Sequence, residues 1–171
     1  ELNEDDAPFV LRLLRDPGWV EHIGDRGVLD LAGAKDYIAD GPRRSYRENG
    51  FGLMRIALRQ TDTPIGICGL VIRESLPGPD LGFTLLTEYA GQGYASEASR
   101  IVIQDAFDRV KLDQLLAITS PKNSASRRLL EKAGFVEVEE QPESAEPDSS
   151  VVYRLNAADR PDATARIGTS A

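Results

Sequence analysis

The spacing of apolar residues divides the chain into a helical first part, a strand-rich middle and a mixed last part. Apolar residues at helical spacing predict a first helix that ends before Asp16-Pro17-Gly18. A second helix is predicted over residues 32–39, interrupted by Gly41-Pro42 and resumed over 43–48. The stretch 19–28 shows neither period, so we expect an irregular loop there.

From Phe51 onward the apolar residues recur at a period of two, which indicates strands. Strands are predicted over residues 51–58, 65–72 and 80–87, and the short turns between them indicate an antiparallel meander. The helical period returns from Tyr94 to about Val110. The remaining predicted elements are a strand over 115–119, a helix that begins after Asn123 and ends at Gly134, and two strands over 135–140 and 151–155. Because a helix separates the strands over 80–87 and 115–119, these two should pair in parallel through a right-handed crossover.

The composition is that of one globular domain and excludes several kinds of site. The chain has 171 residues and a formal net charge of −8, which argues against a nucleic-acid partner because such binding needs a basic face. Cys68 is the only cysteine, so an internal disulfide or a cysteine-based metal site is impossible. His22 is the only histidine and lies far from any nucleophile motif. No apolar run approaches the length of a membrane helix and no signal peptide is visible, so we expect a cytoplasmic protein that does not bind membranes.

The richest chemical signal is the segment Gly91-Gln92-Gly93, which lies between a predicted strand and a predicted helix. The first turn of a helix leaves backbone N–H groups unpaired, and the helix dipole adds partial positive charge there. Glycine lets a phosphate approach the backbone closely, so this loop is a candidate anion site. A tight turn without any ligand is the simpler alternative for this loop taken alone.

Two segments resemble the GNAT superfamily of acyl-CoA-dependent N-acetyltransferases. Tyr89–Ala98 looks like the acetyl-CoA loop of that family, and Asn123–Phe135 resembles its second motif, in the form typical of the RimJ/RimL-like branch. The resemblance implies an α/β (α+β) fold over residues 1–155, with a mixed, mostly antiparallel sheet, one splayed parallel strand pair and helices on both faces. Residues 156–171, small and polar, are expected to form a disordered tail.

The resemblance assigns roles position by position. It implies that Gly91, Gly93 and Ala95 hold the pyrophosphate of acetyl-CoA, with further backbone donors at Gln92 and Tyr94. It also implies that the strand end at Leu85, Leu86 and Thr87 pairs with the pantetheine arm, and that an N–H there polarises the thioester carbonyl. Asn123 matches a pantetheine contact, and Ser126 matches a hydroxyl proposed to protonate the leaving thiolate. No metal is implied.

The chain departs from the family pattern at two positions. Ala90 stands where the loop motif has Arg or Gln, so binding should depend on the backbone donors. Leu130 stands where many relatives place a tyrosine acid, which leaves Ser126 as the candidate donor. The general base is expected at Asp80, with Glu74 and Glu88 as alternatives, although Asp80 also suits a turn after Pro79.

Other residues have plain structural interpretations beside the functional ones. Asn123 and Ser126 can serve as a helix cap, and Cys68 reads as a packing residue of an apolar strand. Trp19 and Tyr37 suit either the core or the wall of an acceptor pocket, and His22 suits a loop that touches substrate or one that does not.

The sequence therefore predicts acetyl transfer from acetyl-CoA directly to a primary amine, on a small molecule or at a protein N-terminus, by a possible homodimer. A non-catalytic acyl-CoA-binding module is the alternative. A nucleotide-phosphate binder is disfavoured because no Gly-Lys-Ser/Thr follows the loop.

Overall fold

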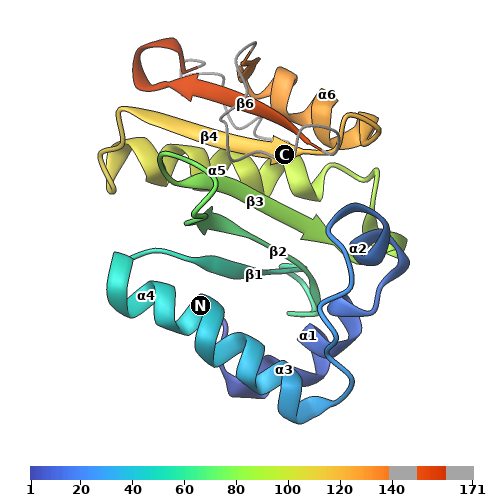
Figure 1. Cartoon of the computed structure of the whole chain (residues 1–171). Helices are drawn as coiled ribbons and strands as arrows, with labels where there is room; N and C mark the ends of the chain where they lie inside the picture. The colour runs from blue at the N-terminus through green and yellow to red at the C-terminus, as the bar shows by residue number, and fades with distance from the viewer. Residues whose placement is uncertain (139–149, 161–171) are drawn as a thin grey trace.

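A six-stranded sheet in the order β1-β2-β3-β4-β6-β5 organises the computed structural model, which describes residues 1–138 and 150–160 (Figure 1). The strands are β1 (Leu53–Ala57), β2 (Pro64–Val71), β3 (Asp80–Leu85), β4 (Gln114–Thr119), β5 (Val136–Glu137) and β6 (Val151–Asn156). The helices are α1 (Ala7–Leu14), α2 (Pro17–His22), α3 (Leu31–Ile38), α4 (Arg44–Asn49), α5 (Tyr94–Asp108) and α6 (Ser124–Lys132). Short 3-10 turns lie at Glu4–Asp6, Thr87–Tyr89 and Ala157–Asp159.

The predicted meander and the predicted parallel pair are both confirmed. β1 and β2 pair antiparallel, as do β2 and β3, whereas β3 and β4 are parallel neighbours. The ladder between β3 and β4 contains only the pair Asp80↔Leu116, so the two strands diverge beyond that point. This divergence is the splayed pair expected from the family resemblance, and it opens the sheet toward the ends of both strands at Leu85 and Thr119.

Two predictions for the N-terminal helices are wrong. Where an irregular loop was expected after Asp16, the side chain of Asp16 accepts from the Gly18 N–H (2.9 Å) and caps α2. This helix has only six residues, too few for a periodic signal to appear. Gly41-Pro42 does not interrupt the chain's helical path either, because a π-helical turn at Ala39–Arg43 joins α3 to α4 and accommodates Pro42.

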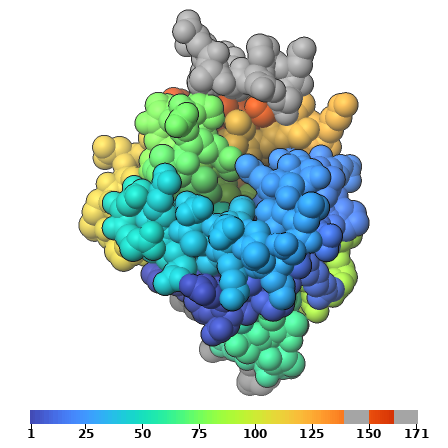
Figure 2. Space-filling model, turned by 60° about the horizontal axis from the view of Figure 1, so that its bottom comes forward, coloured from blue at the N-terminus to red at the C-terminus, as the bar shows by residue number. Residues whose placement is uncertain are grey.

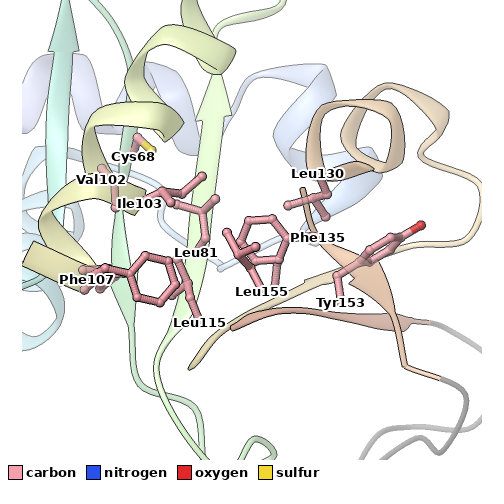
Figure 3. Close-up of a cluster of buried hydrophobic side chains, with 13 residues drawn as sticks. Cys68, Leu81, Val102, Ile103, Phe107, Leu115, Leu130, Phe135, Tyr153 and Leu155 are labelled. Atoms are coloured by element: carbon pink, nitrogen blue, oxygen red, sulfur yellow. The ribbon is translucent and has the colours of Figure 1, made fainter. Parts of the chain in front are cut away.

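Separate hydrophobic clusters cover the two faces of the sheet. Cys68, Leu70 and Leu81 pack with α5, α6 and the strands β4 and β6 on one face, and Figure 3 labels Cys68 and Leu81 in this cluster. On the other face Ile67 packs with α1, α2 and α3. The alternation along β2 and β3 produces this division, since neighbouring residues of a strand point to opposite faces.

The C-terminal elements differ in length from their predictions. β5 covers only Val136–Glu137 of the strand expected over 135–140, whose last two residues lie outside the described part of the chain. β6 extends to Asn156 and the chain remains structured to Arg160, so the beginning of the expected tail is part of the fold. The rest of that tail, 161–171, lies outside the described residues.

Candidate active site

A cavity of about 730 Å³ lies where β3 and β4 diverge, a volume within the usual range for small-molecule sites. We call its two parts the cofactor half and the acceptor half. The cofactor half is lined by members of 85–96 and 118–132, and the acceptor half by members of 17–26 together with Tyr37, Leu53, Ile67, Val71 and Arg73. In Figure 2 the segments near residue 25 (blue) and residue 75 (green) flank a hollow on this face.

The glycine loop forms one end of the cofactor half. Gly91 (φ 76°) and Gly93 (φ 91°) both have left-handed backbones, and Gly93 is the N-cap residue of α5. A Cβ built on either glycine would find no protein atom within 4 Å, so the space beside them is open. Gln92 turns its side chain back and donates to the Glu88 carbonyl (3.1 Å), which holds the loop in place. The first-turn N–H groups of α5 are therefore free to bind an anion in the cavity.

Among the three residues predicted at the strand end, only one has its amide directed into the gap. The Leu86 N–H donates to the Ile65 carbonyl (2.9 Å), and the Thr87 N–H donates to Asp16 (3.1 Å). Since amides alternate along an antiparallel strand, the N–H groups of Phe83 and Leu85 point away from β2, toward β4. β4 has already diverged there, so these two amides face the open gap. The sequence reasoning missed Phe83, although the alternation rule applies equally to it.

Asp16 connects the acceptor half to the cofactor half. Its carboxylate accepts from both the hydroxyl and the N–H of Thr87, and from the N–H of Gly18 in α2. Partial burial raises the pKa of Asp16, but these hydrogen bonds outweigh that effect and the pKa lies below its usual range. The ionised form of Asp16 therefore ties the start of α2 to the end of β3.

Asn123 and Ser126 meet at the start of α6, on the opposite wall of the cofactor half. The Asn123 side-chain oxygen accepts from the Ser126 N–H (2.9 Å), so the capping role is confirmed. Among the described residues neither the amide nitrogen of Asn123 nor the hydroxyl of Ser126 has a hydrogen-bond partner. Both residues line the cavity, so these two polar groups are candidates to contact a ligand.

Asp80 lies beside the cavity but does not line it. Its side chain is fully buried, and the Nε of Arg73 donates to both carboxylate oxygens, at 3.0 and 3.1 Å. Burial raises the pKa of Asp80, and the neighbouring Arg73 guanidinium offsets that rise only in part. The alternative bases are also outside the lining: Glu74 is exposed, and Glu88 pairs with Arg12 at 2.6 Å.

The acceptor half contains side chains to which the sequence reasoning gave no definite role. Trp19 and Tyr37 meet edge to face with ring centroids 6.3 Å apart, and both line the cavity as well as packing in the core. Glu21 and His22 of α2 also line the acceptor half, where they contribute a carboxylate and an imidazole. Arg26 and Arg73 were not predicted. Arg73 follows β2 by two residues, and the pairing of Val71 with Asp80 brings it to Asp80.

The remaining predictions concern Cys68, the loop residues Gln92 and Tyr94, a metal site and a membrane segment. Cys68 is 2% exposed, and burial raises the pKa of its thiol to about 12, so it is a packing residue and not a nucleophile. The cavity lining includes neither Gln92 nor Tyr94, whose possible contribution is through backbone donors only. Within residues 1–138 and 150–160 no group of acidic, histidine or cysteine side chains has a metal-binding arrangement, and no helix there has the length and apolar character needed to cross a membrane.

The fold and this cavity agree with a comparison against known families. Residues 1–136 match the family model described as the acetyltransferase (GNAT) domain. Because the match covers well over half of the chain, the protein belongs to the GNAT acetyltransferase family.

Known relatives support the same family at modest identity. The p20 protein of Bacillus licheniformis, named an uncharacterized N-acetyltransferase, is 27% identical over 132 residues, which are 77% of this chain and 74% of that protein. The structure of an acetyltransferase from Agrobacterium tumefaciens str. C58 matches with a TM-score of 0.77 and 26% identity, over 91% of this chain and 87% of that one. The ribosomal-protein-S5-alanine acetyltransferase of Vibrio fischeri shares the fold, with a TM-score of 0.74 at 16% identity over 94% and 92% of the two chains.

Proposed function

We propose that this protein is an N-acetyltransferase that moves the acetyl group of acetyl-CoA directly to a primary amine. The observation that carries the proposal is one continuous cavity that contains an open helix N-terminus, the unpaired strand amides and a separate acceptor half. A phosphate binder alone would need only the first of these three parts. The RimJ/RimL-like assignment is part of this proposal and is supported by the Asn123–Phe135 motif.

The donor set suits acetyl-CoA. The space beside Gly91 and Gly93, which a Cβ would fill, fits a pyrophosphate against the N–H groups of the first turn of α5. The pantetheine arm would pair along the edge of β3 that β4 leaves open. The free side-chain amide nitrogen of Asn123 would contact that arm from the other wall.

We assign polarisation of the thioester carbonyl to the amides that face the gap. Leu85 carries this role within the predicted set, with Phe83 as its neighbour along the same edge, because the N–H groups of Leu86 and Thr87 are already bonded. A donor aimed at the developing oxyanion stabilises the transition state more than the ground state. The strand edge would thus supply both binding and catalysis.

The transfer requires proton movement on both sides of the new bond. The amine loses a proton, its nitrogen forms a bond to the acetyl carbon, and the carbon–sulfur bond breaks to release CoA as a thiolate. Glu21 and His22 are the acceptor-half groups able to take the proton from the amine. Asp80 remains the sequence-based prediction for the base, but its burial and its pairing with Arg73 favour a positioning role.

Ser126 would donate to the departing thiolate. A thiolate of ordinary pKa, about 8.5, needs little help to leave, so we expect Ser126→Ala to lower kcat by less than about 100-fold, the lower bound for general acid catalysis. Ser124→Ala is the matched control, because Ser124 belongs to the same helix turn but is exposed and does not line the cavity.

A mass-spectrometric screen tests the proposed function. The purified protein is incubated with acetyl-CoA and a panel of small amines and short peptides with free N-termini, and both the acetylated amine and the released CoA are measured. Formation of one acetylated amine for each CoA released supports the proposal. Saturable acetyl-CoA binding without any acetylated amine would instead identify a non-catalytic acyl-CoA-binding module.

A further inference from the structure

Arg73 lines the cavity, and one nitrogen of its guanidinium, Nε, is bound to Asp80. Its Nε–H is shared between the two oxygens of Asp80, at 3.0 and 3.1 Å. Among the described residues its two terminal nitrogens have no hydrogen-bond partner. Arg73 lines the acceptor half, whereas the Asp80 carboxylate is fully buried. The two terminal nitrogens of the guanidinium, whose geometry matches a carboxylate, are thus available to bind a ligand.

The buried Asp80 carboxylate holds the Arg73 side chain in this position. A charge as deeply buried as that of Asp80 is tolerated in a protein only when it is paired. The pairing restricts the long, flexible Arg73 side chain, so less freedom is lost when a ligand binds to its free end. Asp80 is therefore a positioning residue for Arg73.

A second cation lies in the same half of the cavity. Arg26 belongs to a loop with left-handed glycines at Gly24 and Gly27, and the Trp19 indole donates to the Gly24 carbonyl (3.0 Å). The Arg26 and Arg73 guanidinium groups both act to lower the pKa of the Tyr37 phenol, although burial raises that pKa overall. Both cations line the same cavity as Tyr37, whose hydroxyl has no hydrogen-bond partner among the described residues.

The acceptor half is not uniformly positive. Glu21 also lines it, and Asp80 compensates the charge of Arg73. A primary amine is protonated in neutral solution and reaches the cavity as an ammonium ion. The Glu21 carboxylate on the cavity wall is compatible with that positive charge. Two arginines and a carboxylate on the wall of one cavity together suit a molecule that carries both signs of charge.

We propose that the acceptor is a primary amine that also carries an anionic group, such as a carboxylate, and that Arg73 is the specificity-determining residue that binds it. The inference rests on the proposed function, since it concerns the acceptor half of the same cavity. Arg26 and the Tyr37 hydroxyl complete the anion site. Asp80 acts only through Arg73.

Trp19 allows binding to be measured without turnover. It is the only tryptophan of the chain and it lines the acceptor half. Paired ligands are titrated against the acetyl-CoA-free protein while its fluorescence is followed, each pair being one amine as the free carboxylate and as the neutral carboxamide. The pairs run from α-amino acids to longer ω-amino acids and short peptides.

The wild type should bind the best carboxylate at least about tenfold more tightly than its carboxamide, because hydrogen bonds to charged groups are the strong ones. Arg73→Gln alone leaves Asp80 buried and unpaired, so the informative variant is Arg73→Gln with Asp80→Asn, which removes both charges. In this double variant the ratio should fall to about one. Arg73→Lys should keep part of the preference for the carboxylate over its carboxamide. Arg100→Gln, at an exposed position outside the cavity, should leave that preference unchanged.

Three results would overturn the inference: equal affinities within every pair, a preference that persists in the double variant, or no saturable fluorescence change with any pair. Acetylation of the same pairs is measured in parallel. Equal acetylation of carboxylates and carboxamides would refute the anion site while leaving the acetyltransferase proposal intact. Tight carboxylate binding without acetylation would refute the acetyltransferase proposal while leaving the anion site intact.

Discussion

Gly93→Ala tests the binding loop most sharply, because its effects on stability and on binding can be separated. No protein atom lies within 4 Å of the position that the new Cβ would occupy, so the substitution causes no clash within the protein. What remains is backbone strain, since Gly93 has φ 91° and a non-glycine residue in the left-handed region costs roughly 1–2 kcal/mol. For a chain of this size that corresponds to a fall in Tm of about 2–8 °C.

Gly50→Ala is a matched control for that strain. Gly50 has φ 72°, also has open space around its Cβ position, and follows α4 outside the cavity. Thermal unfolding should show a similar loss of stability in both variants. Calorimetric titration with acetyl-CoA should show near-normal affinity for Gly50→Ala and strongly weakened affinity for Gly93→Ala, whose new methyl group occupies the space assigned to the pyrophosphate. Equal affinities in the two variants would refute the loop as the pyrophosphate site.

Three further predictions concern other parts of the cavity. Ala90→Arg should keep or strengthen acetyl-CoA binding in the same titration, because binding here depends on backbone donors; a marked loss would contradict this. Because the pKa of Asp16 is lowered in the folded state, its contribution to stability should be present above the ordinary carboxyl pKa of about 3.8 and lost as the pH falls through the folded value. Urea unfolding should therefore show wild type more stable than Asp16→Asn at about pH 7, with the difference shrinking as the pH falls below that ordinary carboxyl pKa; a constant difference would be inconsistent with the bond to Thr87. Cys68 should react with a thiol reagent only after unfolding, and rapid labelling of the native protein would show that its thiol is accessible.

The fold was predictable because its signals are local and long enough to read. The meander and α5 each have a clear period, and the crossover rule supplies the parallel neighbour of β3. The errors occurred where a cap or a special turn decides the structure. Asp16 begins a helix of only six residues, and a π-helical turn carries the chain through Pro42.

The cofactor half could be predicted more fully than the acceptor half. Its glycine loop and the Asn123 cap are contiguous sequence patterns, and both line the cavity. Which backbone N–H groups at the end of β3 are free to bind a ligand could not be predicted in the same way. That Thr87 is occupied by Asp16, 71 positions away, follows only from the tertiary structure.

The acceptor half is assembled from distant segments, and no local pattern joins them. Arg26 comes from a loop, Tyr37 from α3 and Arg73 from the turn after β2. One signal was available, since a hairpin over β2 and β3 brings Arg73 near Asp80, and opposite charges at the turn end of a hairpin suggest an ion pair. The complete burial of Asp80, on which its proposed positioning role depends, had no such signal.

Direct acetyl transfer is tested by incubating the protein with isotopically labelled acetyl-CoA and an unacetylated amine that the screen identifies as an acceptor. We expect the labelled acetyl group to appear on the amine nitrogen, in equal amount to the CoA released, with none retained on the protein. Label that remains covalently on the protein, or bound acetyl-CoA that yields no labelled amine from any member of the panel, would contradict it.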